Sequence, residues 1–207
     1  MSESEEIEVK FIVTDSNKFR EAIHKAGGVF ESAHAEDNIR FDDAAASLTR
    51  RGMVLRLRVT TTDTRIRYLL TVKSPMIHTD KDLSHRREIE TEISDGSALT
   101  TALGLLGYEP VWRYEKRRET YRIGQIEADI DEMPLGWFLE LEGLPDEIRH
   151  TAERLGLEMT DGLTLSYAQI FDNVKGARGL IMRDLTFDAF EGITVDPEDF
   201  RAKGSPG

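Results

Sequence analysis

Apolar and charged residues alternate at a period of two in several separate stretches of this chain. In the first stretch, Glu6, Glu8 and Lys10 alternate with Ile7 and Val9. Successive side chains of a β-strand point to opposite faces, so these three charged residues share one face of a predicted strand. One such strand is typical of a half-buried sheet with a solvated face. Charged residues again stand two positions apart at residues 56–58, 86–90, 116–118, 129–131 and 140–142, and this repetition favours a closed sheet with a charged interior.

Periodicity and turn residues predict the order of the elements. The predicted strands cover residues 6–14, 29–41, 53–61, 65–73, 86–93, 108–123, 126–131 and 137–143. The predicted helices cover residues 16–26, 97–106, 145–156 and 165–174, with Ser16 as the expected N-cap of the first.

These elements predict an α+β fold, in which an antiparallel, eight-stranded closed β-barrel carries helices on its outside. The strands are antiparallel because most connections are short turns. A barrel of about eight strands encloses space for one small ligand. If its interior is charged, the hydrophobic core must lie between the outer face of the barrel and the helices.

The end of the chain differs in composition from the rest. Residues 1–175 are predicted to form one domain, and residues 176–207 a C-terminal appendage that is partly disordered. A short amphipathic segment is expected near residues 180–190, followed by disorder.

Composition limits the classes of function. The chain has 207 residues, 39% of them hydrophobic, and a net charge of -12, which argues against general nucleic-acid binding or binding to a membrane surface. It has no cysteine and no apolar run near the ~20 residues of a membrane span. Its acidic N-terminus is unlike a signal peptide, so a cytoplasmic location is expected. An acidic protein that places cations in the middle of strands indicates a compact polyanionic ligand.

Several motifs follow one another in an order typical of one family. After the first strand come Leu55-Arg56-Leu57-Arg58, the run from Leu70 to Pro75, the strand 86–90, and Lys116-x-Arg118. Asp131-x-x-Pro-x-Gly and residues 138–143 complete the set. Over about residues 6–173 the chain resembles the CYTH superfamily, the triphosphate tunnel metalloenzymes. That group includes class IV adenylate cyclases, thiamine triphosphatases and inorganic triphosphatases, and its fold is an antiparallel eight-stranded tunnel.

The resemblance implies roles for the matching residues. The implied ligands of Mg²⁺ or Mn²⁺ are Glu6, Glu8, Glu90, Asp131, Glu140 and Glu142, with Asp129 as a second choice. The implied triphosphate-binding residues are Lys10, Arg56, Arg58, Lys73, Arg86, Lys116 and Arg118. Within that set, the residues expected to act in catalysis are Lys10, Arg58, Lys73 and Arg118.

One position departs from the family pattern. Many members carry a basic residue just before the Ser-Tyr pair of the last helix, where this chain has Thr164-Leu165 before Ser166. We therefore expect Arg178 or Arg183 to supply the missing cation.

The residue set suits phosphoryl transfer. Carboxylates can hold a hard divalent cation, and arginine and lysine can bind the remaining phosphate oxygens. The reaction then depends mainly on positioning and on neutralising charge. The resemblance favours an enzyme that hydrolyses the terminal phosphoanhydride of inorganic triphosphate, thiamine triphosphate or ATP. A class IV adenylate cyclase that forms cyclic AMP and pyrophosphate is the first alternative, and a non-catalytic polyphosphate- or nucleotide-binding module is the second. A homodimer is left open.

Overall fold

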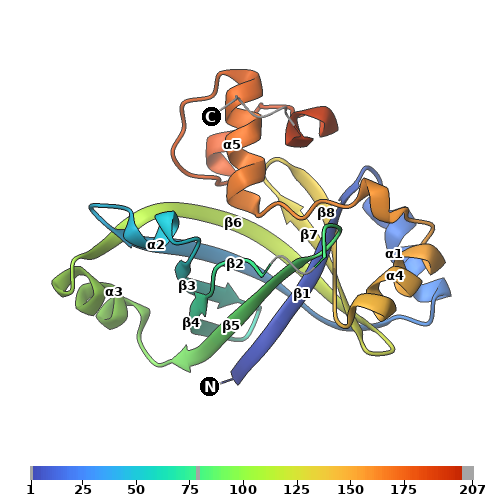
Figure 1. Cartoon of the computed structure of the whole chain (residues 1–207), viewed down its shortest axis with the longest axis horizontal. Helices are drawn as coiled ribbons and strands as arrows, with labels where there is room; N and C mark the ends of the chain where they lie inside the picture. The colour runs from blue at the N-terminus through green and yellow to red at the C-terminus, as the bar shows by residue number, and fades with distance from the viewer. Residues whose placement is uncertain (1, 78–79, 202–207) are drawn as a thin grey trace.

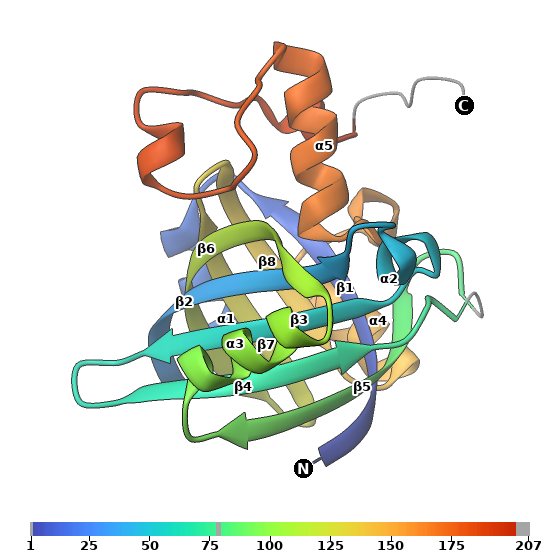
Figure 2. The ribbon, with the colours of Figure 1, turned by 90° about the vertical axis from the view of Figure 1, so that its left-hand side faces the viewer.

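The computed structural model describes residues 2–77 and 80–201 of the chain. Its centre is a closed barrel of eight strands, which are hydrogen-bonded in the order β1-β5-β4-β3-β2-β6-β7-β8, and β8 pairs with β1 to close the ring (Figures 1 and 2). Every neighbouring pair of strands is antiparallel. The predicted α+β barrel is therefore confirmed.

The strands agree closely with the predicted ones. Their bounds are β1 Ser2–Val13, β2 Val29–Asp43, β3 Val54–Thr61, β4 Ile66–Lys73, β5 Ser84–Ile93, β6 Tyr108–Ile123, β7 Ile126–Met133 and β8 Gly136–Glu142. The helices are α1 Ser16–Lys25, α2 Ser47–Arg50, α3 Gly96–Leu105, α4 Pro145–Arg154 and α5 Tyr167–Arg178. Short 3₁₀ turns follow at η1 Met159–Asp161, η2 Asp188–Phe190 and η3 Pro197–Arg201.

The first helix begins one residue away from the expected cap. Asp15, and not Ser16, is its N-cap, and the Asp15 carboxylate accepts hydrogen bonds from the backbone N–H groups of Asn17 and Lys18. An ionised carboxylate also interacts favourably with the positive end of the helix dipole. Asp95 caps α3 in the same way.

The hydrophobic core lies outside the barrel, as predicted. Val9 and Phe11 of β1 are fully buried on the outer face, where Ile23 of α1 and Ile148 of α4 belong to the same apolar cluster. Figure 1 shows α1 and α4 together on that side of the barrel, and α3 at the other end. Because the helices cover the apolar faces of the strands, the opposite faces are left to enclose polar groups.

The C-terminal residues pack on α5 and on the barrel. Phe190 and Phe200 are buried against the same cluster as Phe171 of α5. Leu185 pairs with Tyr114 of β6 through an isolated parallel bridge, so the tail touches the barrel wall directly. Residues 191–201 are thus packed where the sequence analysis expected disorder, whereas residues 202–207 lie outside the described residues. The boundary drawn at residue 175 stays a prediction.

Among the described helices, none combines the length and the apolar character that crossing a membrane would require.

Candidate active site

The interior of the barrel contains a pocket of about 110 Å³, which we call the tunnel. Strands β1 to β6, β8 and the start of α5 supply its lining. The tunnel brings together most of the side chains that the sequence analysis selected, although their individual roles stay predictions. These residues are Glu6, Glu8, Lys10, Arg56, Arg58, Lys73, Arg86, Lys116, Arg118, Glu140 and Glu142.

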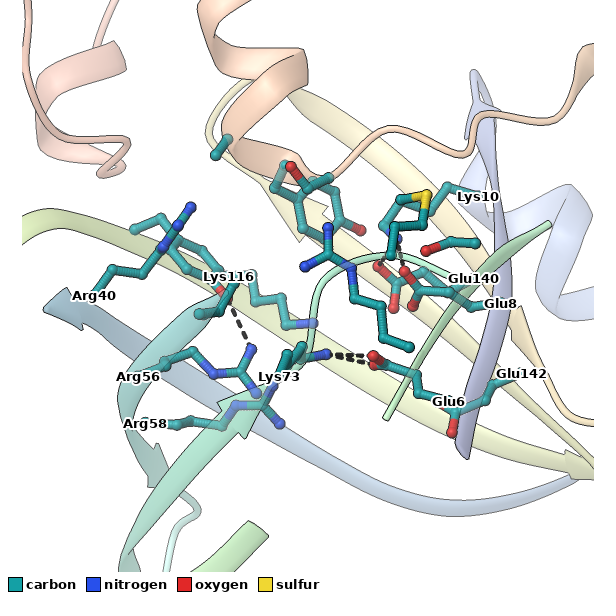
Figure 3. A pocket seen from close by; sticks show the side chains of 18 of the residues that line it. Glu6, Glu8, Lys10, Arg40, Arg56, Arg58, Lys73, Lys116, Glu140 and Glu142 are labelled. Atoms are coloured by element: carbon teal, nitrogen blue, oxygen red, sulfur yellow. Dashed lines mark hydrogen bonds and ion pairs between the residues drawn. The ribbon is translucent and has the colours of Figure 1, made fainter. Parts of the chain in front are cut away.

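Opposite charges occupy opposite sides of the tunnel. Figure 3 shows the carboxylates on one side, and we call this set, Glu6, Glu8, Glu140 and Glu142, the carboxylate wall. The other side is the cation wall, which consists of Arg40, Arg56, Arg58 and Lys116.

Strand register produces this separation. Glu8 of β1 is paired directly with Glu142 of β8, and Arg40 of β2 is paired directly with Arg56 of β3. Like charges that face each other across two strands destabilise a sheet. A fold that places like charges there at two positions does so at a cost in stability.

Two lysines pair with carboxylates of the tunnel. Lys73 Nζ donates to both carboxylate oxygens of Glu6 at 2.5 and 2.6 Å and lies 2.8 Å from Glu88. Lys10 Nζ donates to Glu8 and lies 3.6 Å from Glu140. Burial lowers the pKa of each ammonium, but the carboxylates raise it more, so both pKa values lie above the ordinary lysine value. Both side chains are therefore positively charged.

Asp131 lies behind the tunnel lining. It is fully buried and accepts hydrogen bonds from Arg118 at 2.7 Å, from Lys116 at 2.9 Å and from the Tyr167 hydroxyl at 2.9 Å. These donors occupy the oxygens that the predicted role as a metal ligand would use. In this arrangement Asp131 orients two tunnel cations, and its role toward metal stays a prediction.

Asp129 and Glu90 lie outside the tunnel lining as well. Burial raises the pKa of Asp129 to about 7, although Arg118 lies 2.5 Å from one of its oxygens. Its Oδ1 atom is buried and has no hydrogen-bond partner among the described residues. Glu90 accepts a hydrogen bond from Thr71 at 2.9 Å and is 3.9 Å from Arg56. The structure therefore does not bring Glu90 to the carboxylate wall.

The sequence analysis missed a second charged strand. Glu36, Asn38 and Arg40 alternate along β2 with the same period of two, and this signal was available in the sequence. Glu36 is buried, 3.3 Å from Arg58 and 3.7 Å from Lys116. Burial raises the pKa of Glu36, but these two cations lower it more strongly, to well below its usual range. Glu36 thus holds part of the cation wall in place from behind.

Two tyrosines were also missed. The Tyr114 hydroxyl accepts a hydrogen bond from Arg56 at 3.1 Å. Tyr167 lies under the ammonium groups of Lys10 and Lys116, which are 5.4 and 5.7 Å from its ring centre. Tyrosine has no charge to mark it in a sequence, so only the fold could place these side chains.

A family comparison agrees with this geometry. The model of the CYTH domain family matches residues 4–172 of the chain. This chain belongs to the CYTH domain family.

Several known proteins are similar to this CYTH domain in sequence or in fold. A protein of Methanocaldococcus jannaschii, provisionally named an adenylate cyclase, is 34% identical over 138 residues, which are 66% of this chain and 75% of the relative. A Vibrio parahaemolyticus structure, also provisionally named an adenylate cyclase, has a TM-score of 0.70 at 21% identity and covers 81% of this chain and 97% of its own. A Hippeastrum protein, provisionally named an adenylyl cyclase and described as having a dominant triphosphatase activity, has a TM-score of 0.62 at 19% identity, over 86% and 97% of the two chains.

The carboxylate wall of the CYTH barrel suits a divalent cation by its chemistry. Its donors are carboxylate oxygens, the ligands that Mg²⁺ and Mn²⁺ prefer. The Glu142 carboxyl has no hydrogen bond or ion pair to any described residue, and burial together with Glu6 and Glu8 raises its pKa to about 8. Within residues 2–77 and 80–201, however, no three acidic or histidine side chains are already gathered as a metal site. Glu8 pairs with Lys10 and Glu6 pairs with Lys73, so these two carboxylates face ammonium groups.

The expected substitute for the missing basic residue is not in the tunnel. Arg178 contacts Asp196 and is 2.6 Å from Asp199. Arg183 contacts Asp184 at 2.8 Å and lies beside the tunnel in a neighbouring cavity. The tunnel lining includes Arg40 of β2 instead.

The raised pKa of Glu142 predicts a pH-dependent stability for the protein without metal. Between about pH 4.5 and pH 8, the unfolded chain ionises this carboxyl while the folded chain retains the proton. Stability should therefore fall as pH rises through that window, and Glu142→Gln should remove this loss. Allowing for partial solvent access, we expect Glu142→Gln to be more stable than the wild type by about 2 kcal/mol at pH 8.5 and nearly equal at pH 5.

Urea unfolding in EDTA at the two pH values measures this difference. Glu147→Gln on α4 is the matched control, because it makes the same change at an exposed site. Equal pH dependence in the wild type and in Glu142→Gln would show that Glu142 is ionised in the folded protein.

Proposed function

We propose that this CYTH protein is a divalent-metal-dependent triphosphatase, which binds a triphosphate in the tunnel and hydrolyses its terminal phosphoanhydride. The observation that carries the proposal is the division of one pocket into a carboxylate wall and a cation wall. Carboxylates alone would repel a polyanion, and a site that binds only anions gains nothing from them. A metal–triphosphate complex presents positive charge to one wall and negative oxygens to the other.

The carboxylates and the cations of the tunnel have separate proposed roles. Glu6, Glu8, Glu140 and Glu142 would hold Mg²⁺ or Mn²⁺, which supplies Lewis-acid charge for phosphoryl transfer when it is bound. The forked guanidinium groups of the cation wall bind phosphate oxygens in pairs. Lys10 and Lys73 exchange their carboxylate partners for phosphate oxygens when the substrate enters. Because these cations are already charged and held by buried partners, little reorganisation is needed in the transition state.

Hydrolysis needs only one further reactant. The oxygen of a water molecule bonds to the terminal phosphorus, the bridging P–O bond breaks, and its electron pair leaves with the shortened phosphate chain, while the attacking water loses one proton to the leaving oxygen or to solvent. The triphosphatase activity described for the Hippeastrum protein supports hydrolysis as a reaction that this fold can carry out.

A class IV adenylate cyclase is the second candidate. The name of the Methanocaldococcus jannaschii relative, which is 34% identical, favours it. In that reaction the ribose 3′-hydroxyl attacks the α-phosphorus, and pyrophosphate leaves. The tunnel residues would bind the same triphosphate, so the two candidates differ in which phosphorus is attacked.

One assay separates the candidates. The protein is incubated with inorganic triphosphate, ATP or thiamine triphosphate, with Mg²⁺ or Mn²⁺ at neutral to alkaline pH, and the products are resolved by ³¹P NMR. Orthophosphate that forms with metal and not with EDTA supports the triphosphatase. Cyclic AMP with pyrophosphate from ATP would establish the cyclase instead. Tight, EDTA-sensitive binding without any product would indicate a non-catalytic binding module.

A further inference from the structure

The last described residues of the chain, 180–201, have no part in the proposed function, and we call them the tail. The match to the CYTH domain family ends at residue 172, so the tail lies beyond the matched domain. Figure 1 shows it in red beside α5. Leu185, Phe190 and Phe200 of the tail are buried, each with at most 4% of its surface exposed. Two of these residues make contacts that lead to side chains of the tunnel.

The first contact extends the sheet at the tunnel wall. β7 pairs with β6 only along the second half of β6, and Leu185 occupies the corresponding edge of the first half. Its N–H donates to the carbonyl oxygen of Arg113, and its carbonyl oxygen accepts from the N–H of Glu115, both at 2.9 Å. Tyr114 lies between these two residues, and its hydroxyl accepts the hydrogen bond from Arg56. Leu185 thus fixes the backbone on both sides of the tyrosine that holds a tunnel arginine.

The second contact passes through one aromatic ring. The ring centre of Phe200 is 5.2 Å from that of Phe138 in β8, which is 5.4 Å from that of Tyr167. Asn173 of α5 donates to the backbone carbonyl oxygen of Phe200 at 2.9 Å and so fixes the tail at this point. Phe138 is fully buried, and close packing passes a shift of one ring on to its neighbours. Tyr167, whose hydroxyl donates to Asp131, is such a neighbour.

The two tyrosines hold cations of the tunnel in place. Tyr114 bonds to Arg56, and the ring of Tyr167 lies beneath the ammonium groups of Lys10 and Lys116. Groups that are already in position need little reorganisation when charge develops on a phosphate, and misplacement by about 1 Å is enough to weaken a site severely. A segment that supports both tyrosines from behind therefore bears on the affinity of the tunnel.

We propose that the tail is a positioning segment for the tunnel. Phe200 acts through Phe138 on Tyr167, and Leu185 acts through the backbone of β6 on Tyr114. Both are positioning residues, because neither lines the tunnel. This inference rests on the proposed triphosphate-binding function, and it adds that residues beyond the matched domain set how tightly the tunnel binds its ligand.

A double-mutant cycle tests the route through Tyr167. Phe200→Leu removes the aromatic ring and keeps an apolar side chain. Its effect on the affinity for inorganic triphosphate is measured by calorimetry with Mn²⁺, in the wild-type protein and in Tyr167→Phe. We expect Phe200→Leu to weaken binding about fivefold or more in the wild-type background and less than about twofold in Tyr167→Phe, because an effect that acts through the hydroxyl is lost with it. Phe19→Leu on α1 is the control, because it makes the same change against a separate apolar cluster.

A second measurement needs no ligand. Tyrosine labelled with ¹³C at the ring carbon that carries the hydroxyl gives an NMR signal that reports the hydrogen bond of that hydroxyl. Tyr167→Phe and Tyr114→Phe assign the two signals. We expect Phe200→Leu to move the signal of Tyr167, Leu185→Val to move that of Tyr114, and Phe19→Leu to move neither.

Each outcome decides the proposal. A loss of affinity that depends on Tyr167, together with a moved Tyr167 signal, supports it. An unchanged affinity, an equal loss in both backgrounds or in Phe19→Leu, or unmoved tyrosine signals overturn it and leave the tunnel function standing. If the wild type binds no triphosphate, the proposed function fails, and the NMR signals alone decide whether the tail positions the tyrosines. If Phe200→Leu does not fold, Leu185→Val in a cycle with Tyr114→Phe takes its place.

Discussion

Replacing Arg118 by alanine is expected to cost about 3–5 kcal/mol of folding stability and about 100-fold or more in turnover. Arg118 contacts Asp129 at 2.5 Å, Asp131 at 2.7 Å and Glu140 at 2.6 Å, and all three carboxylates are buried. Removing the guanidinium leaves their negative charges close together in a region with little water. The same group faces the tunnel, where it would neutralise charge on the phosphates.

Two further variants separate folding from catalysis. Arg118→Lys keeps the charge but not the two parallel hydrogen bonds to Asp131, so we expect it to fold and to lose at least about tenfold in turnover. Arg117→Ala is the matched control, since the neighbouring arginine points outward and its exposed side chain pairs with Glu132. Urea unfolding and phosphate release measure the two effects. If Arg118→Ala were as stable and as active as Arg117→Ala, Arg118 would not belong to the site.

Glu8→Gln is expected to reduce metal-dependent turnover by about 100-fold and to shift the Mg²⁺ dependence to higher concentration. Glu8 lies on the carboxylate wall beside Glu142, and its partner in the structure is Lys10. The amide keeps the shape of the side chain and loses the charge that attracts a cation. Burial, together with Glu6 and Glu140, holds the pKa of Glu8 above its ordinary value despite Lys10. The neutral glutamine should therefore fold at least as well as the wild type.

Mg²⁺ titrations of turnover, with calorimetry of Mn²⁺ binding, measure this prediction. Glu5→Gln is the control, because Glu5 precedes Glu8 on the same strand but its side chain is 65% exposed and lies near His85. If Glu8→Gln kept the wild-type midpoint for Mg²⁺, Glu8 would not belong to the metal site.

The barrel was predictable because its strands follow a local rule. Charge and apolarity alternate wherever one face is enclosed and the other packs against helices, and a period of two is visible in the sequence. Small errors arose where side chains compete for the same backbone groups, as at Asp15 and Ser16. The packing of residues 191–201 could not be predicted, because it depends on Phe200 reaching a cluster formed by distant elements.

The sequence predicted which residues line the tunnel better than it predicted where each one lies in it. Charged strand residues were found by alternation, yet β2 was taken as an ordinary strand and its Arg40 was overlooked. Glu90 and Asp131 lie on the predicted faces of their strands. Their positions along those strands, however, place Glu90 beside Thr71, and Asp131 beside Lys116 and outside the tunnel lining. Depth along a barrel follows from strand register, which a single sequence does not specify.

The Lys10–Glu8 and Lys73–Glu6 pairs in the tunnel make the two proposed ligands thermodynamically dependent on each other. A metal that takes Glu6 and Glu8 releases Lys73 and Lys10, and these ammonium groups are then free for phosphate. A triphosphate that takes the lysines frees the same carboxylates for metal. Each ligand should therefore tighten the binding of the other, and linkage requires the factor to be identical in both directions. The barrel would therefore bind either ion alone more weakly than it binds the two together.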